Sequence, residues 1–339
     1  MTTDESANGE DVANLWARIM LAHGSPSLRD RFLEPLVRNE LAVCLLYSEP
    51  GAGSDLAAIQ TTAARDGDEW VVNGQKVWTS GAREAAYGLL IARTDWDEPK
   101  HRGITFFWFP MRQPGVEVRP LRQATGDTRF NEVFLTDARV PDDHRFGAVG
   151  AGWTVLQTAL AYEREVMGLA TRNRATGHDK GDRAYTPGGS IPVPDLRLVT
   201  VARERGRHVD AVVRQDLAAL YTHRLTNLWN GRRAGAAMAG SPSSSLASIG
   251  KLSMSKILHA AGHRHGLLLG AEAMLDGASS TTAADANYSH LNAYFTSIGG
   301  GTDQIQRNII GERLLGLPRE PEVDRGVPFR AVRRATPTE

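Results

Sequence analysis

The sequence has a single cysteine, Cys44, among its 339 residues, and it has no excess of charge of either sign. One cysteine excludes an internal disulfide and is typical of proteins from a reducing compartment. We expect Cys44 to be a small buried apolar residue. The 39 basic and 39 acidic residues cancel, and no basic run is interleaved with aromatic residues, so nucleic-acid binding is not expected.

Long apolar runs are also missing. The apolar stretches, such as residues 266–270, are far too short to cross a bilayer. The first eleven residues are polar and acidic, unlike a signal peptide. We therefore expect a cytoplasmic protein without membrane insertion, long enough for two domains. Its composition, 41% hydrophobic and 23% charged, is ordinary for a globular protein.

The residue pattern changes twice along the chain and predicts an α+β protein, with an antiparallel β domain followed by an all-α helical bundle. The predicted regions are a helical remnant (1–42), a β domain (43–147), a helical bundle (148–320) and an extended polar tail (321–339). Within the bundle, residues 172–196 are rich in glycine and proline and predict a loop.

Individual elements follow from periodicity and turn residues. Residues 69–78 predict a hairpin, because apolar strands flank Asn73 and Gly74, a dipeptide that suits a type I′ turn. Further strands are expected at 87–92, 104–109, 116–120 and 131–135, and helices at 198–205, 212–232, 248–270 and 288–297. Thr302 is expected to be the N-cap of a last helix.

Glu163 lies on the apolar stripe of a helix predicted over residues 153–170. Leu156, Leu160 and Met167 form this stripe, and Glu163 falls between the last two. Burial raises the pKa of a carboxylate, which suits a general base that takes a proton near neutral pH. A structural ion pair with Arg164 or another arginine explains the same pattern, so the pattern alone leaves both interpretations open.

Residues 48–55, SEPGAGSD, form a glycine-rich turn with a hydroxyl near each end. Its glycines let backbone N–H groups approach an anion closely, and Ser48 and Ser54 can add hydrogen bonds. Alone this is a moderate signal, because many segments of glycine and serine merely turn.

Together with residues 73–80, NGQKVWTS, this octet resembles the middle domain of the acyl-CoA dehydrogenase family. Residues 299–313, GGGTDQIQRNIIGER, resemble the helix that closes the flavin site in that family. The three motifs occur in family order, and the resemblance runs from about residue 12 to residue 320. It implies FAD as the cofactor, an acyl-CoA thioester that is dehydrogenated at its α and β carbons, and electron-transfer flavoprotein as the electron acceptor.

The resemblance also implies roles for single residues. Those expected at the cofactor are Tyr47, Ser48, Gly53, Ser54, Trp78, Ser80, Thr302 and Gln304. Trp78 would pack against the isoalloxazine ring and Ser80 would hydrogen-bond it. The alternative for Trp78, which the motif makes the weaker one, is a core aromatic at a strand end. The substrate is expected to contact Ser54 and Arg164. No metal site is expected.

One departure from the family pattern concerns the catalytic base. Many relatives carry a glutamate directly before the Gly-Thr of the closing motif, where this chain has Gly300. A minority branch that handles branched, long or bulky acyl groups has Glu-Arg on the first helix of the C-terminal domain, and Glu163 and Arg164 match that pattern. The resemblance therefore makes Glu163 the leading candidate for the base. The backbone N–H of Gly300 would help to polarise the thioester carbonyl.

Further departures leave two alternatives open. Residues 200–206 lack the Arg-x-x-Phe-Gly segment that reaches a neighbouring subunit's FAD, residues 269–273 replace a Gly-Gly pair, and most of the family's N-terminal helical domain is missing. The chain could be a catalytically inactive or structural subunit of a mixed complex, or an oxidase. Residues 212–232 and 248–270 carry apolar side chains on more than one face, which predicts a homo- or hetero-oligomer with a related subunit.

Overall fold

The computed structural model describes residues 15–173, 197–238, 245–275, 278–322 and 324–332, with the side chains of 163–173, 197, 237 and 238 left out of the description. The chain divides into a β unit, residues 1–163 with 320–339, and a helical unit, residues 164–319. The expected loop at 172–196 lies outside the described residues, apart from the two residues that end helix α3 (Gly152–Asn173).

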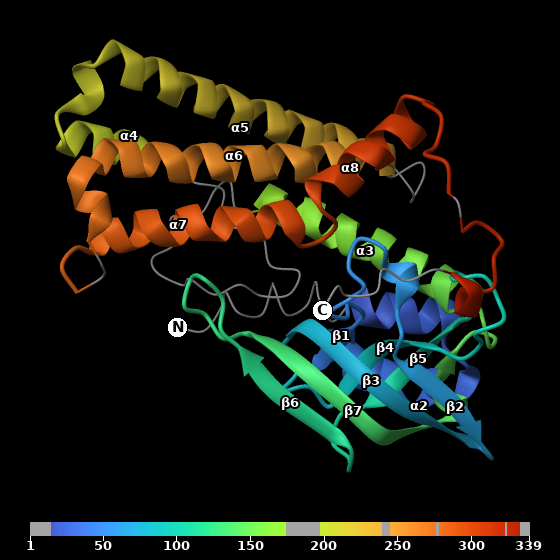
Figure 1. The fold of residues 1–339 in the computed structure, drawn as a ribbon. Coiled ribbons are helices and arrows are strands. Elements are labelled where there is room, and N and C mark those ends of the chain that lie inside the picture. Colours follow the sequence, from blue (N-terminus) through green and yellow to red (C-terminus); the bar gives the residue numbers. More distant parts are fainter. Residues whose placement is uncertain (1–14, 174–196, 239–244, 276–277, 323, 333–339) are drawn as a thin grey trace. The chain divides into compact units, whose positions relative to one another are not determined.

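The β unit is built on an eight-stranded sheet with the order β6-β7-β3-β2-β4-β5-β8 and with β1 beside β4 (Figure 1). Its strands are β1 (Val43–Leu46), β2 (Thr62–Asp66), β3 (Glu69–Ser80), β4 (Tyr87–Arg93), β5 (Ile104–Pro110), β6 (Val116–Leu121), β7 (Phe130–Pro141) and β8 (Arg145–Phe146). The expected strands are confirmed in position. β1 pairs with β4 in parallel, as β2 does at a single register position, so the sheet is mixed rather than wholly antiparallel.

Strands β4 and β5 are buried on both faces, which explains why their sequences are continuous apolar runs rather than alternating ones. On one face Phe107 and Phe109 join the core of the unit. On the other, Trp108 meets Phe32 of helix α2 (Pro26–Val37), with ring centroids 5.4 Å apart. Cys44 is buried in the same core as Phe107, as expected for a small apolar residue.

The predicted hairpin at Asn73 and Gly74 is wrong. Strand β3 runs unbroken through this dipeptide, and the chain instead reverses at residues 67–68, between β2 and β3. The pairing of β3 with β7 shifts register between Val72 and Gly74, so the dipeptide marks a β-bulge. A side chain at Gly74 would place its Cβ 2.4 Å from Thr61 Oγ1, so the glycine serves a close approach rather than a turn.

The helical unit contains α4 (Arg197–Glu204), α5 (Ala211–Met238), α6 (Leu246–Leu269), α7 (Thr281–Ile298) and α8 (Asp303–Ile309), which continues as the π-helical turn η6 (Ile310–Leu314). Helix α6 packs against both α5 and α7 (Figure 1). A Cβ at Gly262 of α6 would lie 2.8 Å from His290 Cα of α7, so this glycine permits their close packing. The expected helices are confirmed, although α7 begins earlier than predicted, after the N-cap Ser280.

The fold class predicted from the sequence is confirmed, but the tail differs from the expected extended segment. Residues 329–331 form a short turn, η7 (Phe329–Ala331), and Phe329 is buried in the β unit. Among the described residues, no helix combines the length and apolar character that crossing a membrane requires.

Candidate cofactor site

The glycine-rich turn, residues 48–55, is fastened to strand β3. The backbone N–H of Val77 donates to Ser48 O over 2.9 Å. The Lys76 ammonium group donates to Tyr47 O over 3.1 Å. Because the C=O and N–H of a peptide point in opposite directions, fixing Tyr47 O towards β3 turns the N–H of Ser48 away from it. Two of the predicted cofactor residues are thus held against β3.

A second β-bulge lies beside this attachment. The pairing of β3 with β7 shifts register between Lys76 and Thr79, which frees the backbone N–H of Val77 to bond to the turn. Trp78 lies in the bulge with a φ of 62°, an unusual value for a residue other than glycine. Trp78 is 55% exposed and forms a T-shaped ring contact with Phe130, so it is not a core aromatic.

A buried ion pair holds the turn. Lys76 is fully buried and its Nζ lies 2.8 Å from Glu49 Oε1. The two carboxylate oxygens also accept hydrogen bonds from the backbone N–H groups of Gln60 and Thr61, over 2.6 and 2.9 Å. Burial opposes ionisation of Glu49, but Lys76 and the two N–H donors outweigh it and hold the pKa of this carboxyl below its usual value. The Glu49 carboxylate is therefore held in its charged form with both oxygens bonded, although burial also lowers the pKa of Lys76.

The outer side of the turn is open. Gly53 and Ser54 are exposed, and a Cβ added at Gly51 or Gly53 would meet no atom within 4 Å. Ser80 follows Trp78 on β3 and is half-buried. The six predicted cofactor residues that precede residue 81 therefore lie on two attached segments of the β unit, the turn with Tyr47 and the end of β3, and the turn is open at Gly51 and Gly53.

The remaining predicted residues lie in the helical unit, in the loop before α8. Gly300 and Gly301 have φ values of 65° and 85°, which favour glycine at both positions. The Gln306 side chain donates to Gly300 O over 3.1 Å and fixes the loop. Thr302 is the N-cap of α8, as predicted, and Gln304 is exposed in the first turn.

A polar network supports the start of α8. Asp303 accepts a hydrogen bond from Ser255 over 2.8 Å and lies 3.4 Å from the ammonium group of Lys251. Ser255 also lies 3.2 Å from the hydroxyl of Ser297. Lys251 and Ser255 are four residues apart, so they share one face of α6 and hold α8 from the same side.

Glu163 and Arg164 follow each other on α3, at the point where the β unit ends and the helical unit begins. Their side chains lie outside the described residues. The apolar stripe that precedes them is confirmed at its start, because Leu156 is fully buried. Gly300 has no side chain that could accept a proton.

The two departures at residues 200–206 and 269–273 meet in the structure. Arg205 forms an ion pair with Glu272, with 2.5 Å between Nη1 and Oε2. Ser280 donates to the same carboxylate over 2.8 Å. The two segments are therefore joined within the helical unit.

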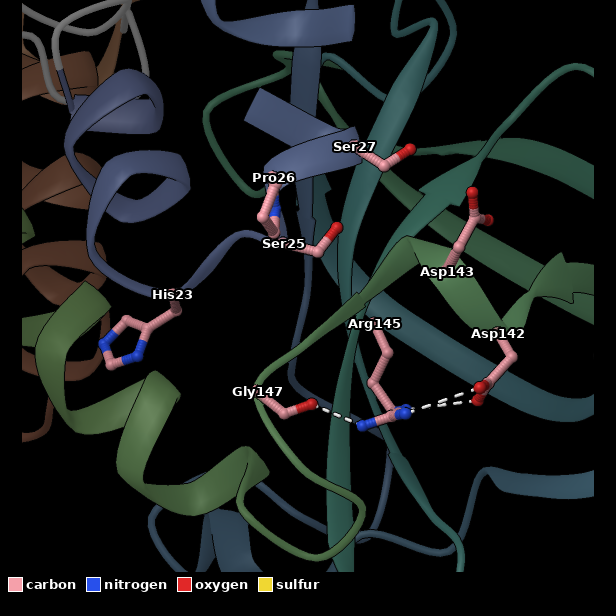
Figure 2. Close-up of a pocket in the computed structure, with 8 residues that line it drawn as sticks. All are labelled: His23, Ser25, Pro26, Ser27, Asp142, Asp143, Arg145 and Gly147. Atoms are coloured by element: carbon pink, nitrogen blue, oxygen red, sulfur yellow. Dashed lines mark hydrogen bonds and ion pairs between the residues drawn. The ribbon is translucent and has the colours of Figure 1, made fainter. Parts of the chain in front are cut away.

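A cavity of about 580 Å³ lies elsewhere in the β unit, at the N-terminus of α2. Its lining residues are His23, Ser25, Pro26, Ser27, Asp142, Asp143, Arg145 and Gly147. Figure 2 shows Arg145 between Asp142 and the carbonyl oxygen of Gly147, bonded to both. None of the predicted site residues lines this cavity. In the described part of the chain, no cluster of three histidine, cysteine, aspartate or glutamate residues could hold a metal ion.

The sequence did carry a signal for Lys76 and Glu49, which were not among the predicted site residues. Trp70, Val72 and Lys76 alternate on the buried face of β3. A lysine on such a face requires a buried partner, and the glutamate of the glycine-rich turn is that partner.

Two family models match this chain, one within the β unit and one within the helical unit. The family described as acyl-CoA dehydrogenase, middle domain, matches residues 44–138, and the acyl-CoA dehydrogenase C-terminal domain matches residues 197–315. The acyl-CoA dehydrogenase IpdE1 of Mycobacterium tuberculosis is 39% identical, over 89% of this chain and 73% of its own length. FadE34 of the same organism, also an acyl-CoA dehydrogenase, is 39% identical over 91% of this chain, but this chain spans only 40% of FadE34.

Solved structures share the fold. The ChsE4–ChsE5 complex from Mycobacterium tuberculosis contains a chain with a TM-score of 0.70 and 29% identity, covering 90% of this chain and 76% of that one. The Tcur3481–Tcur3483 steroid acyl-CoA dehydrogenase gives a TM-score of 0.78 at 24% identity, covering 92% and 77% of the two chains, which supports the fold alone. The chain therefore belongs to the acyl-CoA dehydrogenase family, a family of oxidoreductases that act on CH–CH bonds.

Proposed function

We propose that the chain binds FAD and dehydrogenates an acyl-CoA thioester at its α and β carbons. The observation that carries this proposal is the attachment of the glycine-rich turn to β3, where the buried Lys76–Glu49 pair joins the turn to the strand that carries Trp78. A flat exposed indole beside an open, backbone-lined turn fits a flavin ring and a diphosphate.

The residues of the β unit fit FAD by their chemistry. Open space at Gly51 and Gly53 lets backbone N–H groups approach phosphate oxygens, and the hydroxyls of Ser48 and Ser54 can donate to them. The exposed face of Trp78 provides a stacking surface. From the helical unit, Thr302 and Gln304 would contact the flavin. Bound FAD would accept a hydride from the β carbon of the substrate.

We assign the general base to Glu163, which would take the proton from the α carbon. Gly300, at the position of the glutamate that many relatives use, cannot accept a proton, and its missing side chain leaves space for a bulky acyl group. The N–H of Gly300 would donate to the thioester carbonyl as negative charge develops there. Arg164 and Ser54 would bind the substrate.

The proposed substrate is a bulky, branched or long acyl group, such as one attached to a steroid. The Tcur3481–Tcur3483 enzyme, a steroid acyl-CoA dehydrogenase by name, shares the fold, so a steroid acyl-CoA is one trial substrate for this class. Electron-transfer flavoprotein is the proposed acceptor, and the cytoplasm is the proposed compartment, which suits the single buried thiol of Cys44.

A second candidate is a structural subunit of a mixed complex. The ion pair between Arg205 and Glu272 favours it, because it bonds residues 200–206, where relatives have the segment that reaches a neighbouring subunit's FAD, to residues 269–273 of the same chain. The ChsE4–ChsE5 structure is a complex of two named chains, which supports a hetero-oligomer here. Exposed aromatic residues on α5, Tyr221 and Trp229, suit such an interface.

The visible spectrum separates these functions. The protein is purified alone and with a co-expressed relative, and each sample is mixed anaerobically with a branched or steroid acyl-CoA. A yellow protein that is bleached by the substrate supports the enzyme, and a chain that is colourless alone but part of a yellow complex supports the subunit. Rapid reoxidation by air indicates an oxidase. A sample that is colourless in both cases contradicts the FAD proposal.

The base is tested with Glu163→Gln. This variant should keep the yellow colour but lose about a hundredfold to ten-thousandfold in the rate of flavin reduction, because an amide oxygen is too weak a base. Glu204→Gln, at an exposed position of α4, is the matched control and should leave the rate unchanged. An undiminished rate in Glu163→Gln would make the subunit the better interpretation.

A further inference from the structure

The C-terminal tail lies against the β unit and beyond the matched domains. The C-terminal family match ends at residue 315, and residues 320–339 are grouped with the β unit. The tail pairs with the loop between β4 and β5, residues 94–103. The backbone N–H groups of Phe329 and Arg330 donate to Glu98 O and Trp96 O, each over 3.0 Å.

The side chain of Phe329 covers a buried cation. Phe329 is 3% exposed, and its ring centroid lies 3.6 Å from the guanidinium carbon of Arg93. Arg93 is fully buried and donates to Ala57 O over 2.7 Å and to Ile59 O over 3.1 Å. These two carbonyls belong to the segment that directly follows the glycine-rich turn. Phe329 therefore shields the cation that holds the exit of the turn.

Lys100 makes a second connection between the tail and the turn. Its ammonium group lies 3.0 Å from Asp324 Oδ2 in the tail and 3.3 Å from Asp55 Oδ2, at the end of the turn. The lysine side chain is only 14% exposed, so it is held between the two carboxylates. Both connections reach residues 55–59 from the same tail.

We propose that the tail is a strap that positions the glycine-rich turn: Phe329 acts through Arg93, and Asp324 acts through Lys100. Neither tail residue is among the residues predicted to contact FAD, and both act through another side chain, so both are positioning residues. The proposal rests on the proposed function only in naming FAD as the ligand of the turn. The docking of the tail and the ordering of residues 55–59 do not depend on the proposed function.

The test uses Phe329→Ala and Asp324→Ala in the full chain. Arg325→Ala is the matched control, because Arg325 is an exposed tail residue. Hydrogen exchange is measured on the protein without added FAD. Amides of residues 55–59 and 94–103 should exchange about tenfold faster in Phe329→Ala, since a desolvated cation–π contact contributes on the order of that factor. Trypsin should also cut faster after Lys100 and Arg102.

The FAD dissociation constant is then measured by fluorescence titration. It should rise about tenfold in Phe329→Ala and less in Asp324→Ala, whose contact is partly exposed to solvent. The rate at saturating FAD should stay unchanged, since the strap positions the turn without taking part in the reaction. Phe329→Tyr keeps the aromatic ring and should restore both the exchange rates and the FAD affinity.

Each outcome decides the proposal. Unchanged exchange at residues 55–59 in Phe329→Ala overturns it, and so does faster exchange without any loss of FAD affinity. If the Phe329→Ala chain unfolds, hydrogen exchange and FAD affinity are measured on Asp324→Ala instead. A wild-type chain that binds no FAD contradicts the proposed function instead, and the exchange experiment then decides on the strap alone.

Discussion

Replacing Lys76 by methionine should destabilise the β unit by about 3 kcal/mol. The substitution keeps most of the side-chain volume but leaves Glu49 charged and buried without its cation. Losing one partner of a buried pair typically costs about 3–5 kcal/mol. We expect the lower end, because two backbone N–H groups still bond to the carboxylate of Glu49. A loss of this size is a large share of the ~5–15 kcal/mol that stabilises a typical domain.

The double variant Lys76→Met with Glu49→Gln should be more stable than the sum of the two single changes predicts, because it leaves no uncompensated charge. The assay is urea unfolding followed by circular dichroism. Lys256→Met, at an exposed position of α6, is the control and should change the free energy of unfolding by less than about 0.5 kcal/mol. Additive single costs, or a cost below about 1 kcal/mol for Lys76→Met, would refute the reasoning.

The same pair sets a pH dependence. The folded pKa of Glu49 lies below its ordinary value of 4.5. The unfolded chain therefore binds the proton more readily, and the stabilisation is present above about pH 4.5 and is lost as the pH falls through the folded pKa. Glu49→Gln should lose stability less steeply in this acid range than the wild type does.

Three other outcomes follow from the β unit. Gly74→Ala should lower the free energy of unfolding by about 1–3 kcal/mol, because its Cβ would overlap Thr61. Gly51→Ala should leave the free energy of unfolding nearly unchanged in chemical unfolding, because its Cβ would enter open space. Burial lowers the pKa of His144 below 6.5, so the wild type should lose stability as the pH falls below about 6.5, and His144→Gln should flatten that slope. Trp78→Gly should leave stability within about 1 kcal/mol, since relief of the positive φ offsets the lost ring contact, but it should weaken FAD binding in a fluorescence titration.

The sequence was most informative where local pattern and burial agree. The short apolar runs of β4 and β5 predicted strands because such runs suit strands that are buried on both faces. Thr302 predicted a helix start because its hydroxyl can accept from a free N–H of the first turn, here that of Ile305. The site motifs could be located by residue type and order. The attachment of the glycine-rich turn to β3 could not be predicted, because it depends on the ion pair between Glu49 and Lys76, which lie on different elements.

The errors have a physical cause as well. The dipeptide Asn73–Gly74 suits a turn, but it also suits a bulge that approaches Thr61 closely, and only the strand partner distinguishes the two. The tail gave no signal, because Phe329 is a single aromatic in a polar segment. Its burial depends on Arg93, a buried cation far away in sequence.

The conformation of Trp78 links stability to the proposed function. A left-handed backbone costs a residue other than glycine about 1–2 kcal/mol, and here the large side chain stays more than half exposed beside Phe130. Folding alone would favour glycine at this position. The surroundings nevertheless impose the conformation, because Val77 bonds to the turn and Lys76 is fixed by Glu49. A strained, exposed indole that is held this firmly favours a role at a ligand, since strain of this kind persists where the side chain is needed and the neighbouring structure enforces it.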